Sequence, residues 1–247
     1  MTYRSLPAMD IKQHFLTRLL ECGAAGGMPV IAEIKAYTPV AGDLLRQRKV
    51  EDIVQQYEKA GMACVSVVTG RWFGGSPALL NRVAGATSLP VLRKDFIASR
   101  SAIERSRELG ASAVLLTRKI VNAGVLKKLV EQALSFGLTP FIEVASAREM
   151  EGLELDGEAV LAINNRDISS RETDLGDIAT SLSLLDAARA TGAGAVVSAS
   201  AITTADEAKQ LLNAGFDGLL IGTAFLSAPD LSEILDVFRA RLFGANG

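Results

Sequence analysis

The sequence is poor in residue types that several classes of protein need. It has only two cysteines, Cys22 and Cys64, which are too few for a disulfide framework and are not in a CxxC spacing. We interpret both as ordinary thiols, because a free cysteine packs like a small hydrophobic residue. The single histidine, His14, has no second histidine to form a zinc site with, and a lone histidine is more often structural than catalytic.

Strong charge imbalance and long apolar runs are also missing. The 26 Lys and Arg residues nearly balance the 28 Asp and Glu residues, and no stretch gathers basic side chains as a nucleic-acid site does. Apolar runs such as Ala113–Leu116 are far shorter than the roughly 18 residues of a membrane span. Met1–Asp10 has no basic region followed by an apolar run, as a secretory signal has. We therefore expect a cytoplasmic protein without nucleic-acid or membrane partners.

The composition favours an α/β protein with one large core. Hydrophobic residues make up 49% of the chain and aromatic residues only 5%, so small aliphatic side chains must do most of the packing, as in buried parallel sheets. The length of 247 residues is close to the roughly 250 residues of an eight-stranded α/β barrel. We expect a single domain over residues 1–247.

A recurring pattern predicts repeated strand and helix units. Helix-like segments end in glycine before a short apolar run, as at Gly61 before Ala63–Val68 and at Gly215 before Gly218–Ile221. Glycine just past a helix adopts the left-handed conformation without steric cost, and the apolar run is the next buried strand. Strands are expected near residues 30–35, 63–68, 90–94, 113–117, 139–144, 159–163, 194–198 and 217–221.

These runs predict a (β/α)8 TIM barrel, because strands that alternate with helices pair in parallel and eight of them close without a free edge. An open doubly wound sheet is the alternative, but its glycine-rich nucleotide fingerprint is missing after the first strand. Ser99, Ser146 and Thr203 stand where helix N-caps are expected.

A short helical extension is expected at residues 1–28, before a barrel at residues 29–243. Ile11, Phe15 and Leu19 share one face of an amphipathic stretch. This pattern predicts a helix that packs against the bottom or side of the barrel.

Charged residues stand where the predicted strands end, which is where barrels of this kind carry their chemistry. Glu33 and Lys35 close the first strand and both face the interior by the period of two, while Lys94 closes the third strand and Glu143 the fifth. Such groups must pair when buried, and pairing shifts their pKa values as acid–base catalysis requires. A purely structural ion network is the alternative.

Small residues follow the last two strands and predict a phosphate site. Backbone N–H groups at Ser200-Ala201 and Gly222-Thr223 are free of bulky side chains and near expected helix N-termini. Tight helix–strand packing is the alternative. Thr38, after the first strand, adds a hydroxyl that could reach the same anion.

Five strand-end motifs resemble those of the indole-3-glycerol-phosphate synthase family. They are Val30–Lys35, Leu92–Ile97, Phe141–Val144, Ile163–Asp167 and Ile221–Ala224, in order along residues 29–243. The resemblance implies a carbon–carbon lyase of tryptophan biosynthesis. This enzyme closes the indole ring of a carboxyphenylamino-deoxyribulose phosphate with loss of carbon dioxide and water, without metal or organic cofactor.

The resemblance also implies roles for single residues. Lys94 is expected to be the general acid that protonates the ribulose carbonyl oxygen, and Glu143 the base that assists dehydration. Glu33, Lys35 and Asn164 would order the polyhydroxyl chain. The expected binding residues are Arg166 for the anthranilate carboxylate, Phe73 and Phe96 for the aromatic ring, and Thr38, Ser200, Ala201, Gly222 and Thr223 for the phosphate.

The chain departs from the family pattern in three places. After the seventh strand the family's Glu-Ser-Gly is Ala199-Ser200-Ala201, so a carboxylate is missing and a glycine has gained a methyl group. After the first strand, the family's basic residue and serine are Ala36 and Thr38, with Tyr37 between them. The N-terminal extension is shortened to about one helix.

These departures leave two alternatives to the family reaction. One is a related lyase on the same scaffold that acts on another phosphorylated sugar-amine, and the other is a catalytically silent binding barrel. Retention of Lys94 and Glu143 argues against the silent barrel. The sequence leaves the oligomeric state open and is compatible with a monomer.

Overall fold

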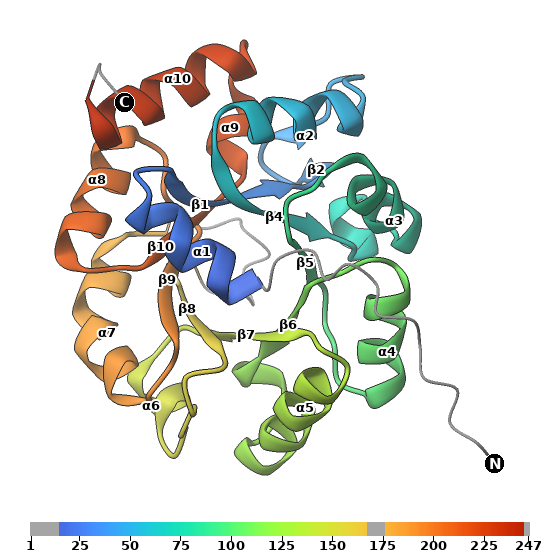
Figure 1. Ribbon diagram of the computed structural model, residues 1–247, viewed down its shortest axis with the longest axis vertical. Coiled ribbons are helices and arrows are strands. Elements are labelled where there is room, and N and C mark those ends of the chain that lie inside the picture. Colours follow the sequence, from blue (N-terminus) through green and yellow to red (C-terminus); the bar gives the residue numbers. More distant parts are fainter. Residues whose placement is uncertain (1–14, 167–175, 245–247) are drawn as a thin grey trace.

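The computed structural model describes residues 15–166 and 176–244, and eight strands among them form a closed barrel (Figure 1). All neighbouring strands of the barrel pair in parallel. The predicted TIM barrel is confirmed, with strand ends within two residues of those expected. The strands are β1 (Met28–Ile34), β4 (Met62–Val68), β5 (Val91–Lys94), β6 (Ala113–Thr117), β7 (Thr139–Val144), β8 (Val160–Asn164), β9 (Ala195–Ala199) and β10 (Gly218–Ile221).

Helices surround the barrel and cover the outer face of its strands (Figure 1). None of the described helices is long and apolar enough to span a membrane. The helices are α2 (Val50–Lys59), α3 (Pro77–Ala86), α4 (Arg100–Glu108), α5 (Ala123–Ser135), α6 (Ala147–Met150), α7 (Ala179–Ala190), α8 (Ala205–Ala214), α9 (Thr223–Ser227) and α10 (Leu231–Phe243), with the 3-10 turns η1 (Arg71–Phe73) and η2 (Arg118–Ile120).

Helix α1 (Phe15–Ala24) closes the end of the barrel at which the strands begin. Phe15 and Leu19 are fully buried, and the Phe15 ring meets the Phe141 ring edge-on inside the barrel, 6.2 Å between centroids. A Cβ atom at Gly218, the first residue of β10, would lie only 2.8 Å from Leu19. The expected packing against the bottom of the barrel is therefore confirmed, although Ile11 and His14 lie outside the described residues.

Both cysteines belong to this closed end and are buried free thiols, as expected. Burial raises the pKa of both thiols, so neither is a reactive thiolate. Their role is packing between α1 and the strands.

The helix starts were predicted well, with one error. Ser99 caps α4 by accepting a backbone N–H, and Ser146 stands at the N-cap of α6 without a side-chain capping bond. The prediction for Thr203 was wrong by one residue, because Thr204 is the N-cap of α8. Thr204 forms a capping box with Glu207, while the Thr203 hydroxyl donates to the Glu207 carboxylate from outside the helix.

Alternation along the strands sends every second side chain into the barrel and its neighbours toward the helices. The inner positions form one apolar cluster with α1, and the outer positions form a second cluster with the helices. The strand register places Glu33 of β1 beside Ser66 of β4, and Val68 of β4 beside Lys94 of β5. Charged side chains of β1 and β5 therefore reach the same end of the barrel interior.

Candidate active site

Glu33 lies at the centre of an ion network at the carboxyl ends of the strands. Its Oε1 is 3.1 Å from the Nζ of Lys35, and its Oε2 is 3.2 Å from the Nζ of Lys94. The side chains of Glu33 and Lys35 are each 3% exposed, so water screens their charges poorly. The predicted convergence of these three side chains is confirmed.

The two ammonium groups decide the ionisation of Glu33. Burial by itself would raise the pKa of this carboxyl, but the charges of Lys94 and Lys35 outweigh burial and lower its pKa to about 2. Glu33 is therefore an anion at neutral pH, and it holds both lysines at the mouth of the barrel.

Gly222, directly after β10, makes room for Glu33. A Cβ atom at position 222 would lie 2.8 Å from the Cβ of Glu33 and 2.9 Å from its Oε1. Any larger residue there would displace the carboxylate from its two lysines. The need for glycine at this position is thus steric.

Glu143, on β7, has the opposite tendency. Burial raises its pKa and outweighs the lowering effects of the Lys94 charge and of a hydrogen bond from Asn164, while the carboxylates of Glu33 and Glu149 add smaller increases. Its Oε2 has no hydrogen-bond partner among the described residues. A carboxylate with a raised pKa is a stronger proton acceptor near neutral pH, as a general base must be.

A cavity of about 160 Å³ opens beside Glu33 and Lys35, between the ends of β9 and β10. Most of the binding residues predicted from the sequence line this cavity and so come together. The predicted site residues that line the cavity are Glu33, Lys35, Arg166, Ser200, Ala201, Gly222 and Thr223.

Several residues of this cavity were not among the site residues predicted from the sequence. Ser227 is the most informative, because its Oγ is buried and has no hydrogen-bond partner among the described residues. It lies four residues after Thr223 on α9, so both face the cavity from one side of the short helix. Spacing alone could have found Ser227, had a helix been expected there. The other additions are Ile202, Thr203, Leu220, Ile221 and Ala224.

The segment after β9 has an uncommon backbone conformation. Ser200 and Ala201 both have positive φ, at 67° and 56°, in the left-handed region that favours glycine. Buried Asn165 holds this segment, because its Nδ2 donates to the Ser200 carbonyl and to the Ser198 Oγ, each at 3.0 Å. The methyl group of Ala201, where the family has glycine, is thus carried in a conformation that costs about 1 kcal/mol or more.

The two predicted aromatic residues, Phe73 and Phe96, make different contacts. The Phe73 ring lies 5.7 Å from the Nζ of Lys35, while Phe96 packs on Trp72 with ring centroids 5.4 Å apart. Phe96 and Trp72 are 44% and 52% exposed, so they form an open wall at the rim. The sequence analysis named Phe73 and Phe96 but missed Trp72, the partner that holds Phe96.

Thr38 is not among the residues that line the cavity. It belongs to a small hairpin of β2 (Tyr37–Thr38) and β3 (Gly42–Asp43), and its Oγ1 accepts the N–H of Ala41 at 3.0 Å. Its expected contact with the phosphate stays a prediction. Tyr37, its neighbour, is exposed.

Asn164 is the last residue of β8, and Arg166 lies two residues after it. The Oδ1 of Asn164 accepts the backbone N–H of Arg166 at 3.0 Å, which turns the chain so that Arg166 lines the cavity. Asp167, at the end of the fourth motif, lies outside the described residues. Over those residues, no group of three or more metal-ligating side chains occurs.

A closed parallel barrel with lysines, carboxylates and a small cavity at the carboxyl ends of its strands defines the class of protein, a (β/α)8-barrel enzyme. Comparison with known proteins specifies it further. Residues 4–237 match the family model described as indole-3-glycerol phosphate synthase, and the chain belongs to this family of lyases. The resemblance carried by the five motifs is confirmed.

Relatives from distant organisms agree with this assignment, and each carries the name indole-3-glycerol phosphate synthase. The chain is 41% identical to the protein of Pyrococcus furiosus over 211 residues, which are 85% of this chain and 91% of the relative. It is 38% identical to the protein of Carboxydothermus hydrogenoformans, over 90% of this chain and 83% of the relative. Identity to the protein of Syntrophobacter fumaroxidans is 35%, over 98% and 88%.

Proposed function

We propose that the protein closes the indole ring of carboxyphenylamino-deoxyribulose phosphate, with loss of carbon dioxide and water and without a metal or organic cofactor. The observation that carries the proposal is the ion network in which Glu33 holds Lys94 beside a cavity, with Glu143 on the same rim. Family membership supports the reaction class.

The negative charges of the substrate match the cationic and N–H groups that line the cavity. The substrate has a phosphate at one end and a carboxylate at the other, and it needs cations and N–H donors at both. Backbone N–H groups of Ser200, Ala201 and Thr223 can hold the phosphate, and Lys35 lies beside them. Arg166, which also lines the cavity, can meet the carboxylate of the anthranilate ring.

The first bond forms between the ring carbon that bears the carboxylate and the ribulose carbonyl carbon. Lys94, held by Glu33, delivers a proton to the carbonyl oxygen as this bond forms. The bond to the carboxylate then breaks, carbon dioxide leaves, and the electron pair restores the aromatic ring. Glu33, Lys35 and Asn164 keep the polyhydroxyl chain in place during these steps.

Dehydration completes the product. The new hydroxyl group takes up a proton from solvent and leaves as water, and Glu143 accepts the proton that the substrate must lose to form the ring double bond. Its raised pKa makes the carboxylate a better acceptor than an exposed glutamate.

A second candidate is the same chemistry on a related phosphorylated sugar-amine. Ala199 favours it, because this buried methyl group stands beside Asn164 where the family has a glutamate. A substrate that offers no polar group at this point would lose nothing by the change.

One assay separates these candidates. Purified protein is incubated with carboxyphenylamino-deoxyribulose phosphate, and the appearance of indole fluorescence is followed. Turnover supports the family reaction. Binding of the substrate without turnover favours the second candidate, and the absence of turnover with sugar-amine analogues as well would indicate a silent barrel.

We also propose that residues 1–247 act as one domain, since the site is assembled from strands of a single barrel. The oligomeric state stays open, and a monomer is compatible with this site. Sedimentation of the purified protein tests the oligomeric state. The cytoplasmic location expected from the sequence stays a prediction.

A further inference from the structure

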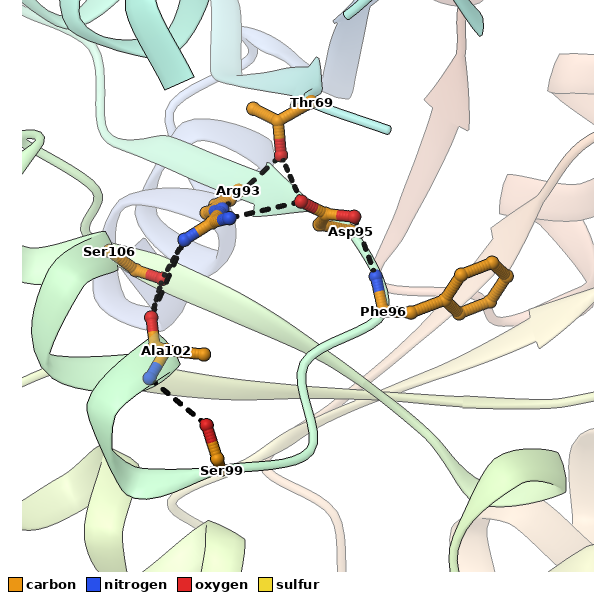
Figure 2. A network of polar contacts seen from close by, with 7 residues as sticks. All are labelled: Thr69, Arg93, Asp95, Phe96, Ser99, Ala102 and Ser106. Carbon is orange, nitrogen blue, oxygen red and sulfur yellow. Dashed lines mark hydrogen bonds and ion pairs between the residues drawn. The ribbon is translucent and has the colours of Figure 1, made fainter. Parts of the chain in front are cut away.

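A second polar cluster lies on the outer face of β5, behind the site. We call Thr69, Arg93, Asp95 and Ser106 the Arg93 clamp (Figure 2). The Arg93 guanidinium donates to the Asp95 Oδ2 at 3.0 Å, to the Thr69 Oγ1 at 3.2 Å and to the Ser106 Oγ at 3.1 Å. The Ser106 hydroxyl donates in turn to a carbonyl of α4 at 2.7 Å. The clamp thus joins the loop that follows β4 to β5 and to α4.

Thr69 is the centre of this clamp. Its hydroxyl donates to the Asp95 Oδ2 at 2.7 Å and accepts from the Arg93 Nε, while its backbone N–H donates to the Lys94 carbonyl at 3.0 Å. The residue is 3% exposed, so water competes little for these bonds. A single buried threonine therefore fixes the residue before Lys94, the residue after it and the Lys94 backbone itself.

The clamp also joins the two loops that form the aromatic rim. The loop after β4 leaves from Thr69 and carries Trp72 on η1. The loop after β5 starts with Asp95, whose Oδ1 accepts the Phe96 N–H at 2.9 Å. Figure 2 shows the Phe96 side chain pointing away from the Arg93–Asp95 pair, and its ring packs on Trp72.

Stability alone does not explain a charged cluster at this place. The Arg93 and Asp95 side chains are only 11% and 21% exposed, and the outer positions of the neighbouring strands carry aliphatic residues. A buried ion pair is often no more stabilising than well-packed apolar side chains of similar volume. What the forked guanidinium adds is a fixed geometry among several acceptors.

We propose that Thr69, Arg93 and Asp95 are positioning residues for the reaction, which set the place of Lys94 over the substrate and hold Phe96 against Trp72. The inference rests on the proposed role of Lys94. The clamp residues touch no substrate and act through the backbone of β5 and through the two loops. A displacement of about 1 Å at a reacting group can lower the rate by about 100-fold, so such support matters for turnover.

Trp72 makes the proposal testable without substrate, because it is the only tryptophan of the chain. Its emission maximum and its quenching by acrylamide report directly on its packing against Phe96. Thr69→Val removes the hydroxyl and keeps the shape of the side chain, whereas Thr69→Ser keeps the hydroxyl. Thr191→Val is the matched control, since this buried hydroxyl donates to the Ala188 carbonyl at the opposite end of the strands.

We expect Thr69→Val to lower kcat by about ten-fold or more, with a red shift of Trp72 emission and stronger quenching. Thr69→Ser should stay within about two-fold of the native kcat, and Thr191→Val should change neither kcat nor emission, whatever its effect on Tm. Should Thr69→Val fail to fold, Arg93→Lys replaces it, because lysine keeps the charge but cannot reach three acceptors.

A folded Thr69→Val variant with native kcat and native Trp72 emission overturns the proposal. So does a Thr69→Ser variant that is impaired as strongly as Thr69→Val, since the hydroxyl would then not be the cause. Native protein that fails to turn over the substrate refutes the proposed function instead, and the Trp72 comparison still decides whether the clamp holds the rim.

Discussion

Replacement of Lys94 by methionine should abolish turnover and also change how stability depends on pH. Methionine keeps the length and apolar stem of the side chain and removes the ammonium 3.2 Å from the Glu33 Oε2. General acid–base catalysis contributes about 100-fold to 10,000-fold to a rate, so kcat should fall by at least about 100-fold. Indole fluorescence measures this loss.

The effect on stability follows from the pKa of Glu33. This pKa is about 2 in the folded protein against an ordinary 4.5, a difference that corresponds to about 3 kcal/mol of stability at neutral pH. Because the folded pKa is the lower one, this stability is present above about pH 4.5 and is lost as the pH falls towards 2. Without Lys94, only Lys35 opposes the burial of Glu33, and we expect more than half of this contribution, about 2 kcal/mol or more, to disappear.

Chemical denaturation at pH 7 and at pH 3 measures the change. The native protein should lose more stability between these two values than the Lys94→Met variant does. Lys128→Met, at an exposed position of α5, is the control and should alter stability by less than about 0.5 kcal/mol. Unchanged turnover would remove Lys94 from its role as the acid, and an unchanged pH dependence of stability would refute the ion network around Glu33.

Four further changes test the rest of the site. Gly222→Ala should displace Glu33, lower the free energy of unfolding by about 1–3 kcal/mol in denaturant titrations and impair turnover; native stability would contradict the steric argument. In the native enzyme, kcat should fall at acid pH as Glu143 becomes protonated, and this fall should lie above pH 4.5 because the pKa of Glu143 is raised. Glu143→Gln should remove this fall from the pH profile of kcat. Ser227→Ala should raise KM by about five-fold with kcat retained if its hydroxyl binds the phosphate, as one neutral hydrogen bond contributes about 1 kcal/mol, and an unchanged KM would exclude the contact. Ala199→Glu should raise turnover of the family substrate if the missing carboxylate is a handicap, whereas a fall would indicate adaptation to another substrate.

Local pattern was enough to predict the parts of the site that a single strand positions. The period of two along β1 placed Glu33 and Lys35 on the inner face, and the parallel arrangement brought Lys94 to the same end. Such features depend on neighbours in the sequence and on one rule of topology, and both are visible without coordinates.

Contacts between distant segments could not be predicted in the same way. Two partners of Arg93 lie 24 residues before it, at Thr69, and 13 residues after it, at Ser106, and nothing in the local pattern links them to Arg93. The error at Thr203 has another origin, since Thr204 is an equally good N-cap by composition. Ser227 was missed because the five-residue helix that carries it is too short to leave a periodic signal.

The seal formed by α1 has a consequence for how this molecule can change. Phe15 and Leu19 fill the end of the barrel at which the strands begin, so small molecules must enter and leave at the opposite rim. The apolar packing that α1 adds to the barrel therefore lies away from the rim that carries the site. Replacements at the rim, such as Ala199, leave this packing intact. Substrate specificity can therefore change by substitutions at the carboxyl ends of the strands, while the packing of α1 at the other end keeps the protein folded.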